Sequence, residues 1–223
     1  MLSKSQNSSL FYSITFLLAA CSILYELVLA QTLAFFLANT VVCFSVTIGF
    51  YLLAMGCGAL YCQFQKEQVG WLSLLKAEIA LTLLGASSVG LLYFAHSLAG
   101  VFLNGGAVGI AKFIFLSVAV CLICAIGFFS GWELPILIQE GKGAKTNRIL
   151  AADYTGSLLG AVLFPIVLLP HFELLEISFG IALVNILIAI VISFVYLSKT
   201  RVRVWMCPLI LGCVLSGFLF TAP

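Results

Sequence analysis

Charged residues are scarce in this sequence. Asp, Glu, Lys and Arg make up only 8% of its 223 residues, whereas a soluble domain carries roughly 25%. A water-soluble domain of this length needs a polar surface, and so little charge excludes one. The net charge of +2 is not gathered into a basic face with interleaved aromatic residues, so the composition gives no indication of nucleic-acid binding.

Long apolar runs dominate the chain instead. The sequence is 63% hydrophobic, with a mean hydropathy of +1.23, and a transmembrane helix needs about 20 apolar residues. We therefore predict an all-α fold, a polytopic transmembrane helical bundle of about seven helices. It forms a single integral membrane domain over residues 1–223, with no soluble catalytic domain. The predicted spans are residues 10–37, 41–62, 71–93, 107–138, 149–169, 172–197 and 204–221.

The basic residues predict how this bundle is oriented. Seven spans leave Lys112 alone on one side of the membrane and place every other Lys and Arg on the opposite side. Cytoplasmic loops of membrane proteins are enriched in Lys and Arg. We therefore predict a multi-pass protein of the cell (inner) membrane with a cytoplasmic N-terminus. An eighth span within residues 97–138 would bring the C-terminus to the cytoplasm as well.

The cysteines raise the question of a metal or redox site. They lie inside or at the edges of apolar runs, and Cys121 and Cys124, although spaced C-x-x-C, lack polar neighbours. A thiol buried in a membrane usually packs as a small hydrophobic side chain. His96 and His171 are isolated in predicted loops, and no nucleophile–base pair is recognisable. We therefore predict no metal, no cofactor and no catalytic residue, and expect that this chain alone is not an enzyme.

Four acidic residues fall within predicted spans: Glu26, Glu78, Glu133 and Asp153. A charge at the bilayer centre costs on the order of a few kcal/mol, so each needs a partner, water or a function. Glu26 and Lys112 lie at similar predicted depths, and one hypothesis is an intramembrane ion pair between them. The alternative is that Lys112 extends to the headgroups while Glu26 bonds to a neighbouring polar side chain.

Glu78, Glu133 and Asp153 each lie near the cytoplasmic end of a predicted span. If the three helices are neighbours, their carboxylates line one vestibule that opens to the cytoplasm and suits a cation. They are therefore our candidate substrate-binding residues. The alternative is that each carboxylate is stabilised by itself, through the helix dipole and nearby lysines such as Lys76.

Small residues predict where the helices touch. In lipid, close approach of two backbones through glycine takes the place of a hydrophobic driving force. The candidate packing residues are Gly56, Gly127, Gly131, Gly156 and Gly160. Kinks are expected at Pro135 and Pro165, because proline removes a helical hydrogen bond. Asn39 and Asn185 are interpreted as internal hydrogen-bond partners.

Three blocks occur in order along the chain: residues 25–61 (YELVLAQTLAFFLANTVVCFSVTIGFYLLAMGCGALY), 131–138 (GWELPILI) and 153–170 (DYTGSLLGAVLFPIVLLP). Their order, spacing and unusual acidic residues resemble the N-terminal membrane domain of membrane-bound polyamine aminopropyltransferases, the spermidine synthase family. The resemblance covers most of the chain from Tyr25 to about residue 190. The residues that match the membrane-domain pattern are Tyr25, Glu26, Glu133, Pro135, Asp153 and Pro165.

The resemblance implies a function connected with polyamines. In that family the membrane domain is followed by a soluble Rossmann-like domain, which binds decarboxylated S-adenosylmethionine and transfers an aminopropyl group. This sequence contains no Gly-rich strand–turn–helix with a downstream acid to bind the nucleoside, so no catalytic residue of the family can be assigned. The expected partners are the lipid bilayer, a soluble aminopropyltransferase or a second copy of this chain, and polyamines.

The sequence leaves three functions open. The first is a membrane module that anchors or partners a polyamine-synthesising enzyme and handles polyamines at the membrane. The second is a stand-alone small transporter of a cationic or amine substrate. The third is a structural membrane subunit, whose charges only fix the packing of the helices.

Overall fold

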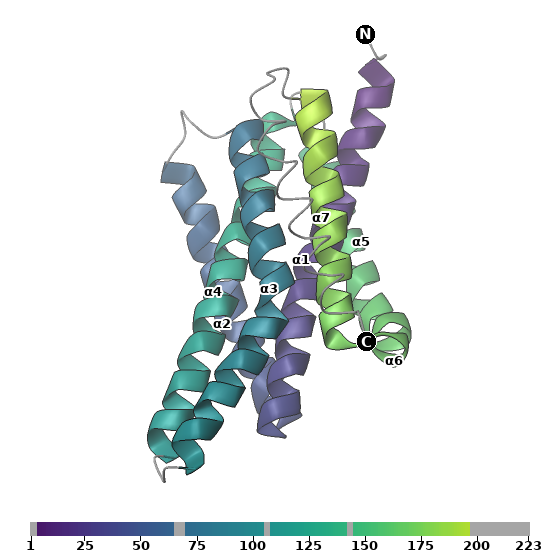
Figure 1. Cartoon of the computed structure of the whole chain (residues 1–223). Helices are drawn as coiled ribbons and strands as arrows, with labels where there is room; N and C mark the ends of the chain where they lie inside the picture. Colours follow the sequence, from purple (N-terminus) through teal and green to yellow (C-terminus); the bar gives the residue numbers. More distant parts are fainter. Residues whose placement is uncertain (1–3, 65–69, 105–107, 142–144, 197–223) are drawn as a thin grey trace.

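The computed structural model describes residues 4–64, 70–104, 108–141 and 145–196, which form the helical bundle in Figure 1. Every regular element within these ranges is a helix. The long helices are α1 (Lys4–Leu37), α2 (Thr40–Phe64), α3 (Trp71–Asn104), α4 (Val108–Glu140) and α7 (Leu174–Tyr196). Between α4 and α7 the chain forms α5 (Thr146–Leu163), a π-helical turn η1 (Phe164–Leu168) and the short α6 (Leu169–His171).

Six helical segments of the described ranges are long and apolar enough to cross a membrane. The α5–η1–α6 segment, Thr146–His171, counts as one of them. Apolar sequence in lipid has to satisfy its own backbone hydrogen bonds, and a helix does so within one segment. The predicted all-α polytopic bundle is therefore confirmed, while the predicted span 204–221 lies outside the described residues.

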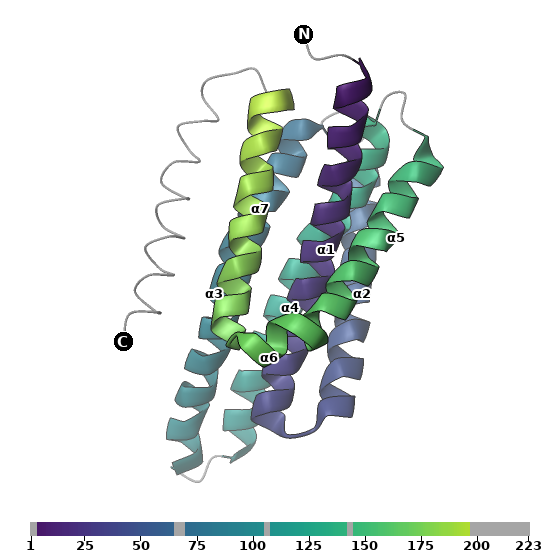
Figure 2. The ribbon, with the colours of Figure 1, turned by 90° about the vertical axis from the view of Figure 1, so that its right-hand side faces the viewer.

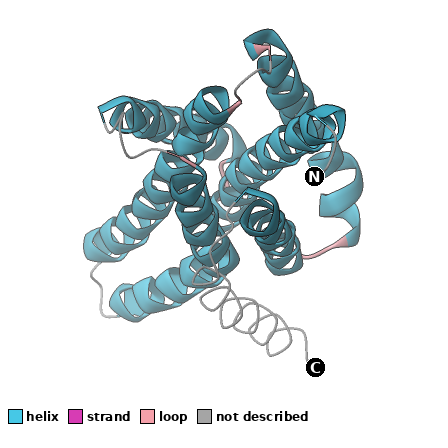
Figure 3. Ribbon diagram, turned by 90° about the horizontal axis from the view of Figure 1, so that it is seen from above, coloured by secondary structure: helices cyan, strands magenta, loops and turns pink. Residues whose placement is uncertain are grey.

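The helices pack around α1. This helix contacts α2, α5 and α7 most extensively, and α4 and α3 over shorter stretches. α4 packs against both α2 and α3, and α3 packs against α7. Figure 2 shows α5 crossing α1 at an angle before the chain turns at α6 into α7. Figure 3 shows the same bundle from above, with the helices seen roughly along their lengths.

The turn between α1 and α2 follows from two residues. Ala38 adopts a positive φ of 51°, and its N–H bonds to the carbonyl of Ala34 at 3.0 Å, which ends α1. The side-chain oxygen of Asn39 then accepts the N–H of Val42 at 3.2 Å. Such a bond satisfies one of the free N–H groups at the start of a helix. Asn39 therefore bonds locally, as its interpretation from sequence required.

Glycines make the closest contact between α2 and α4. A Cβ atom on Gly131 would overlap the backbone carbonyl of Met55, and one on Gly127 would press on the backbone of Tyr51. The same holds between α1 and α5. A Cβ atom on Gly156 would overlap the Phe16 carbonyl, and one on Gly160 would meet Ala20 and Ile23. These glycines allow two backbones to touch, which supplies packing in lipid.

Gly56 differs from the other predicted packing glycines. A Cβ atom there would meet nothing within 4 Å, so Gly56 makes no close contact in the described part of the chain. Gly58 does so instead, because its Cβ position coincides with the carbonyl of Phe128 on α4. Gly56 and Gly58 are two residues apart, which corresponds to about 200° of rotation around the helix axis, so they lie on nearly opposite faces of α2. The sequence alone did not show which of these two faces contacts α4.

Two predicted loops are helical in the structure. α3 continues through His96 to Asn104, because Gly100 alone does not break a helix and the His96 ring stacks on Phe36 with centroids 4.3 Å apart. His171 is the last residue of α6. Of the two prolines, Pro135 lies inside α4, which continues to Glu140, and Pro165 lies in the π-helical turn.

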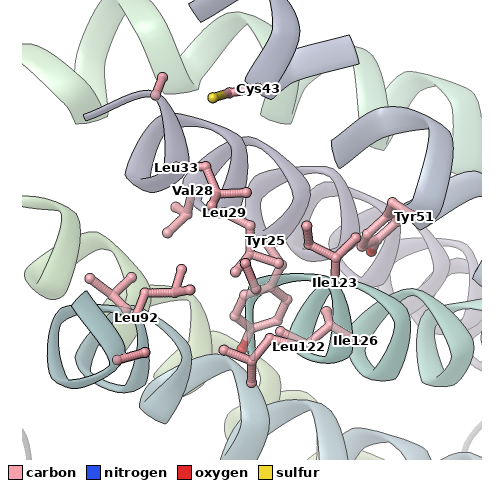
Figure 4. Packing of buried hydrophobic residues seen from close by; sticks show 14 of the residues in the cluster. Tyr25, Val28, Leu29, Leu33, Cys43, Tyr51, Leu92, Leu122, Ile123 and Ile126 are labelled. Atoms are coloured by element: carbon pink, nitrogen blue, oxygen red, sulfur yellow. The ribbon is translucent and has the colours of Figure 1, made fainter. Parts of the chain in front are cut away.

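The largest apolar cluster lies where α1, α3 and α4 meet, and Figure 4 shows its centre around Tyr25. The Tyr25 side chain is buried against residues of α1, α3 and α4, and a Cβ atom on Gly85 would overlap its ring. Other large apolar side chains point outward: Val41, Phe64 and Phe113 are 76%, 84% and 73% exposed. In a membrane these outward side chains contact lipid, so their exposure carries no penalty.

Candidate functional site

Three carboxylates lie at one depth of the bundle. Glu78 is seven residues after the first residue of α3, Glu133 seven before the last of α4, and Asp153 seven after the first of α5. Seven residues of helix measure about 10 Å. These three helix ends lie on the same side, because α4 runs antiparallel to α3 and α5 returns from the end of α4 (Figure 1). We call Glu78, Glu133 and Asp153 the carboxylate cluster.

Their charges interact across the helices. Glu133 lies within electrostatic reach of both Glu78 and Asp153. The three residues differ in burial: Glu78 is fully buried, Glu133 is 6% exposed, and Asp153 is half-buried. The structure therefore brings the three predicted site residues into one region, with Asp153 nearest to the surface of the bundle.

Glu78 is the most unusual member of the carboxylate cluster. Its side chain has 0% exposure, and neither carboxylate oxygen has a hydrogen-bond partner in the described part of the chain. Lys76, two residues before it, is exposed and points away from the interior. A buried polar group without a partner costs roughly 1–3 kcal/mol, and a charged one costs more. Burying Glu78 without a partner therefore makes the free energy of folding less favourable. An acidic residue kept at such a position is a candidate for a function.

A network of hydroxyl groups lies next to the carboxylate cluster. The Tyr51 hydroxyl of α2 lies 2.9 Å from Ser22 Oγ, 3.0 Å from the Ser22 carbonyl and 2.9 Å from Ser130 Oγ. Tyr51 is also within electrostatic reach of Glu133 and Glu26. These hydroxyls link α1, α2 and α4 and connect the carboxylate cluster with Glu26. Tyr51 was not among the residues selected from the sequence, where it is recognisable only as a tyrosine in the middle of an apolar span.

Glu26 and Lys112 are not brought together. Glu26 is buried, at 6% exposure, whereas Lys112 is exposed near the start of α4. No ion pair joins them within the described residues, where Lys112 is exposed. The hydrogen bond from Glu26 to a neighbouring polar side chain, which the alternative to the ion pair also includes, stays a prediction.

An apolar groove runs beside the carboxylate cluster. It has a volume of about 390 Å³ and lies between α1, α5 and α7, with the η1 turn at one end. Cys21 of α1 lines this groove and also lies within electrostatic reach of Glu78 and Glu133. Cys21 is therefore a residue that the groove shares with the surroundings of the buried glutamates. From the sequence it was interpreted only as a small hydrophobic residue.

The chemistry of the region is that of a cation site. Carboxylates accept hydrogen bonds and attract positive charge, and the surrounding apolar helices strengthen both interactions. Within the described residues, no group of His, Cys, Asp and Glu side chains is arranged to hold a metal ion.

The fold and this interior define a multi-pass membrane protein built from apolar helices. Comparison with known proteins adds the family. A polyamine aminopropyltransferase of Leptospira interrogans is 29% identical over 185 residues, 80% of this chain and 34% of that protein. Polyamine aminopropyltransferase 2 of Streptomyces coelicolor is 34% identical over 164 residues, 70% of this chain and 28% of that protein. A polyamine aminopropyltransferase of Oceanobacillus iheyensis is 25% identical over 203 residues, 88% of this chain and 37% of that protein.

These matches confirm the resemblance to polyamine aminopropyltransferases. Such relatives cover about 80% of the chain at 25–34% identity, and the apolar helices fit a membrane domain of that family. The chain spans about a third of the length of the curated relatives it matches. No family model matches the chain, and no solved structure matches it.

The comparisons correct one expectation from the sequence. The chain was expected not to be an enzyme, because it contains no recognisable catalytic residues. The proteins that match most of its length are named as enzymes, the polyamine aminopropyltransferases. An enzymatic assignment is therefore positively indicated. The expectation failed because it relied only on catalytic motifs within this sequence, whereas the enzymatic indication comes from the names of its relatives.

Proposed function

We propose that this chain is the membrane domain of a polyamine aminopropyltransferase and holds the transferase activity at the membrane surface. The observation that carries the proposal is similarity along most of the chain to proteins of that name. The similarity extends through the apolar helices, so it concerns the membrane part of these relatives. Polyamines and the transferase are the partners that this proposal assigns.

The proposal includes an orientation. The carboxylate cluster lies near the ends of α3, α4 and α5 that adjoin Trp71, Glu140 and Thr146. Lys76, Lys145 and Arg148 lie at the same helix ends, and basic residues favour the cytoplasmic side. This side therefore faces the cytoplasm of the cell membrane, where the transferase reaches soluble substrates.

A fractionation experiment tests the proposal. The full protein, tagged, is expressed in its own cells, and aminopropyl transfer to putrescine is measured in membrane and soluble fractions. We expect the activity to sediment with the membranes and to be captured with the tagged protein. Deleting the gene should remove the activity from the membrane fraction. Activity that stays soluble and independent of this chain would contradict the proposal.

Orientation is tested by labelling single cysteines in the same cells. A Lys76→Cys variant should react with a membrane-impermeant maleimide only after the cells are lysed. A Lys112→Cys variant should react in unlysed cells, once the envelope layers outside the cell membrane have been made permeable to the reagent. The reverse pattern would contradict the proposed orientation. The native cysteines are first replaced by alanine, and retained membrane activity shows that the replacement is tolerated.

A further inference from the structure

A second buried polar group without a partner lies on α7. Asn185 is 1% exposed, and its side-chain oxygen Oδ1 has no hydrogen-bond partner in the described part of the chain. Its interpretation as an internal hydrogen-bond partner therefore leaves this oxygen unexplained. Glu78 Oε1 and Oε2 are also buried and also lack a hydrogen-bond partner in the described part of the chain.

The register of α3 and α7 places these two residues opposite one another. The Ser178 hydroxyl donates to the carbonyl of Gly85 at 2.6 Å, which fixes one point of contact between the helices. Because the helices are antiparallel, moving seven residues back along α3 and seven forward along α7 leads to Glu78 and Asn185. Seven residues are about two turns, so both remain on the contact face.

Another contact beyond this point agrees with the register. Leu75 of α3 and Ala189 of α7, each about one turn further along, belong to one buried apolar cluster. Glu78 and Asn185 thus lie between two established contacts of the same helix pair. Three buried oxygen atoms that accept hydrogen bonds therefore lie along one stretch of the α3–α7 contact.

The number of missing donors identifies the ligand. A proton on Glu78 would supply a single O–H donor, which could serve Asn185 Oδ1 but would leave the other carboxyl oxygen of Glu78 without a donor. A primary ammonium group carries three N–H donors and no acceptor. It also brings the positive charge that a buried carboxylate requires, and a paired charge with satisfied hydrogen bonds is tolerated in an apolar interior.

We propose that Glu78 and Asn185 bind one primary ammonium group between α3 and α7, with Glu133 of α4 supplying a second negative charge beside it. Asp153 of α5, nearer to the surface, lies within electrostatic reach of Glu133. The identification of the ligand as the end of a polyamine rests on the proposed function. The binding of an ammonium group does not, because it follows from the three acceptors.

Binding is measured with the full protein in nanodiscs of uncharged lipid, with radiolabelled propylammonium as the probe. We expect saturable binding. Trimethylpropylammonium carries the same charge but no N–H donor, so it should compete at least about tenfold less well, because each hydrogen bond to a charged group contributes 1.5–3 kcal/mol. Equal competition by the two cations, or no saturable binding of propylammonium, would overturn the proposal. This comparison uses the unaltered protein and is independent of the folding of any variant.

Two variants locate the site. Glu78→Gln keeps the shape of the side chain but removes its charge, and Asn185→Leu removes the acceptor from α7. Both should weaken propylammonium binding, by about tenfold or more for Glu78→Gln and by a smaller factor for Asn185→Leu. Glu173→Gln, which removes an exposed carboxylate next to α7, serves as the matched control and should bind normally. Normal binding by both site variants would overturn the assignment.

The two proposals fail in different ways. If the ammonium site is wrong while the proposed function holds, Glu78→Gln and Asn185→Leu bind propylammonium as the unaltered protein does, and transferase activity still sediments with the membranes. If the proposed function is wrong while the site exists, propylammonium binds and the activity stays soluble. Each experiment therefore decides its own proposal.

Discussion

Two helix contacts, that of α2 with α4 and that of α3 with α7, differ in what lies between the backbones. The first contains glycines, Gly58, Gly127 and Gly131, each pressed against a main-chain group of the other helix. The second contains Ser178, bonded to Gly85, and the buried pair Glu78 and Asn185. In the first contact the main-chain groups that meet are already hydrogen-bonded within their own helices, whereas the second contact leaves three buried acceptors without donors in the described part of the chain.

The two contacts are therefore expected to have different roles, the α2–α4 contact in stability and the α3–α7 contact in ligand binding. In lipid, close packing of backbones is a main source of helix association, so the α2–α4 contact holds the bundle together. An interface with unpartnered acceptors costs free energy unless something supplies the donors. The α3–α7 contact is therefore the place where a ligand can bind without first breaking a hydrogen bond of the protein.

The largest effect is expected from Gly131→Ala in the α2–α4 contact. The new Cβ atom would overlap the carbonyl of Met55, and overpacking costs about 1–3 kcal/mol. We expect the free energy of unfolding to fall by this amount, measured by reversible titration of bicelle-embedded protein with SDS. Gly56→Ala is the control, because a Cβ atom there meets nothing within 4 Å. Equal effects of the two substitutions would show that α2 and α4 do not touch at Gly131.

The second effect has the opposite sign and concerns the α3–α7 contact. Glu78→Met replaces an unpartnered buried carboxylate with an apolar side chain of similar length. In the absence of amines, we expect the free energy of unfolding to rise by about 1–3 kcal/mol, because the cost of the buried carboxylate disappears. The same substitution at the exposed Glu173 should have little effect. A clear loss of stability in Glu78→Met would mean that Glu78 has a partner in the folded protein.

The fold could be predicted from sequence because lipid leaves few choices. An apolar run of sufficient length has to form a helix, so the first six predicted spans match helices of the structure. The prediction failed at residues 96–104, where a loop was expected and α3 continues. The span was correctly identified as a helix, but its predicted length was too short. A polar histidine and a glycine suggested a loop, and only the tertiary contact of His96 with Phe36 shows why the helix continues.

The candidate site was predictable in part, for a related reason. Acids in apolar spans are conspicuous in a sequence, so Glu78, Glu133 and Asp153 could be selected and their depth estimated. Depth does not say which face of a helix a side chain occupies. Lys112 therefore had a suitable depth and still points outward, and the pairing of Asn185 with Glu78 needed the register between two helices that are distant in sequence.

A third, smaller effect is expected in the hydroxyl network that links α1, α2 and α4. Tyr51→Phe removes the hydroxyl that lies 2.9 Å from Ser22 Oγ and from Ser130 Oγ. The serines can turn to carbonyls of their own helices, so we expect a loss of only about 1 kcal/mol in the free energy of unfolding. Tyr154→Phe, at a side chain 67% exposed, is the control. If the two variants behave alike, the network does not contribute to stability.

The smallest effect is expected from Ser178→Ala, which removes the hydrogen bond from Ser178 to the Gly85 carbonyl between α3 and α7. Hydrogen bonds between membrane helices contribute about 0.6 kcal/mol on average, so stability should change little. Ser87→Ala, whose hydroxyl bonds to Leu83 of its own helix, is the control. Propylammonium binding is the more informative measurement, because this bond sets the register that places Asn185 opposite Glu78. We expect weaker binding with nearly unchanged stability in Ser178→Ala, and unchanged binding would show that the register is fixed by the apolar contacts alone.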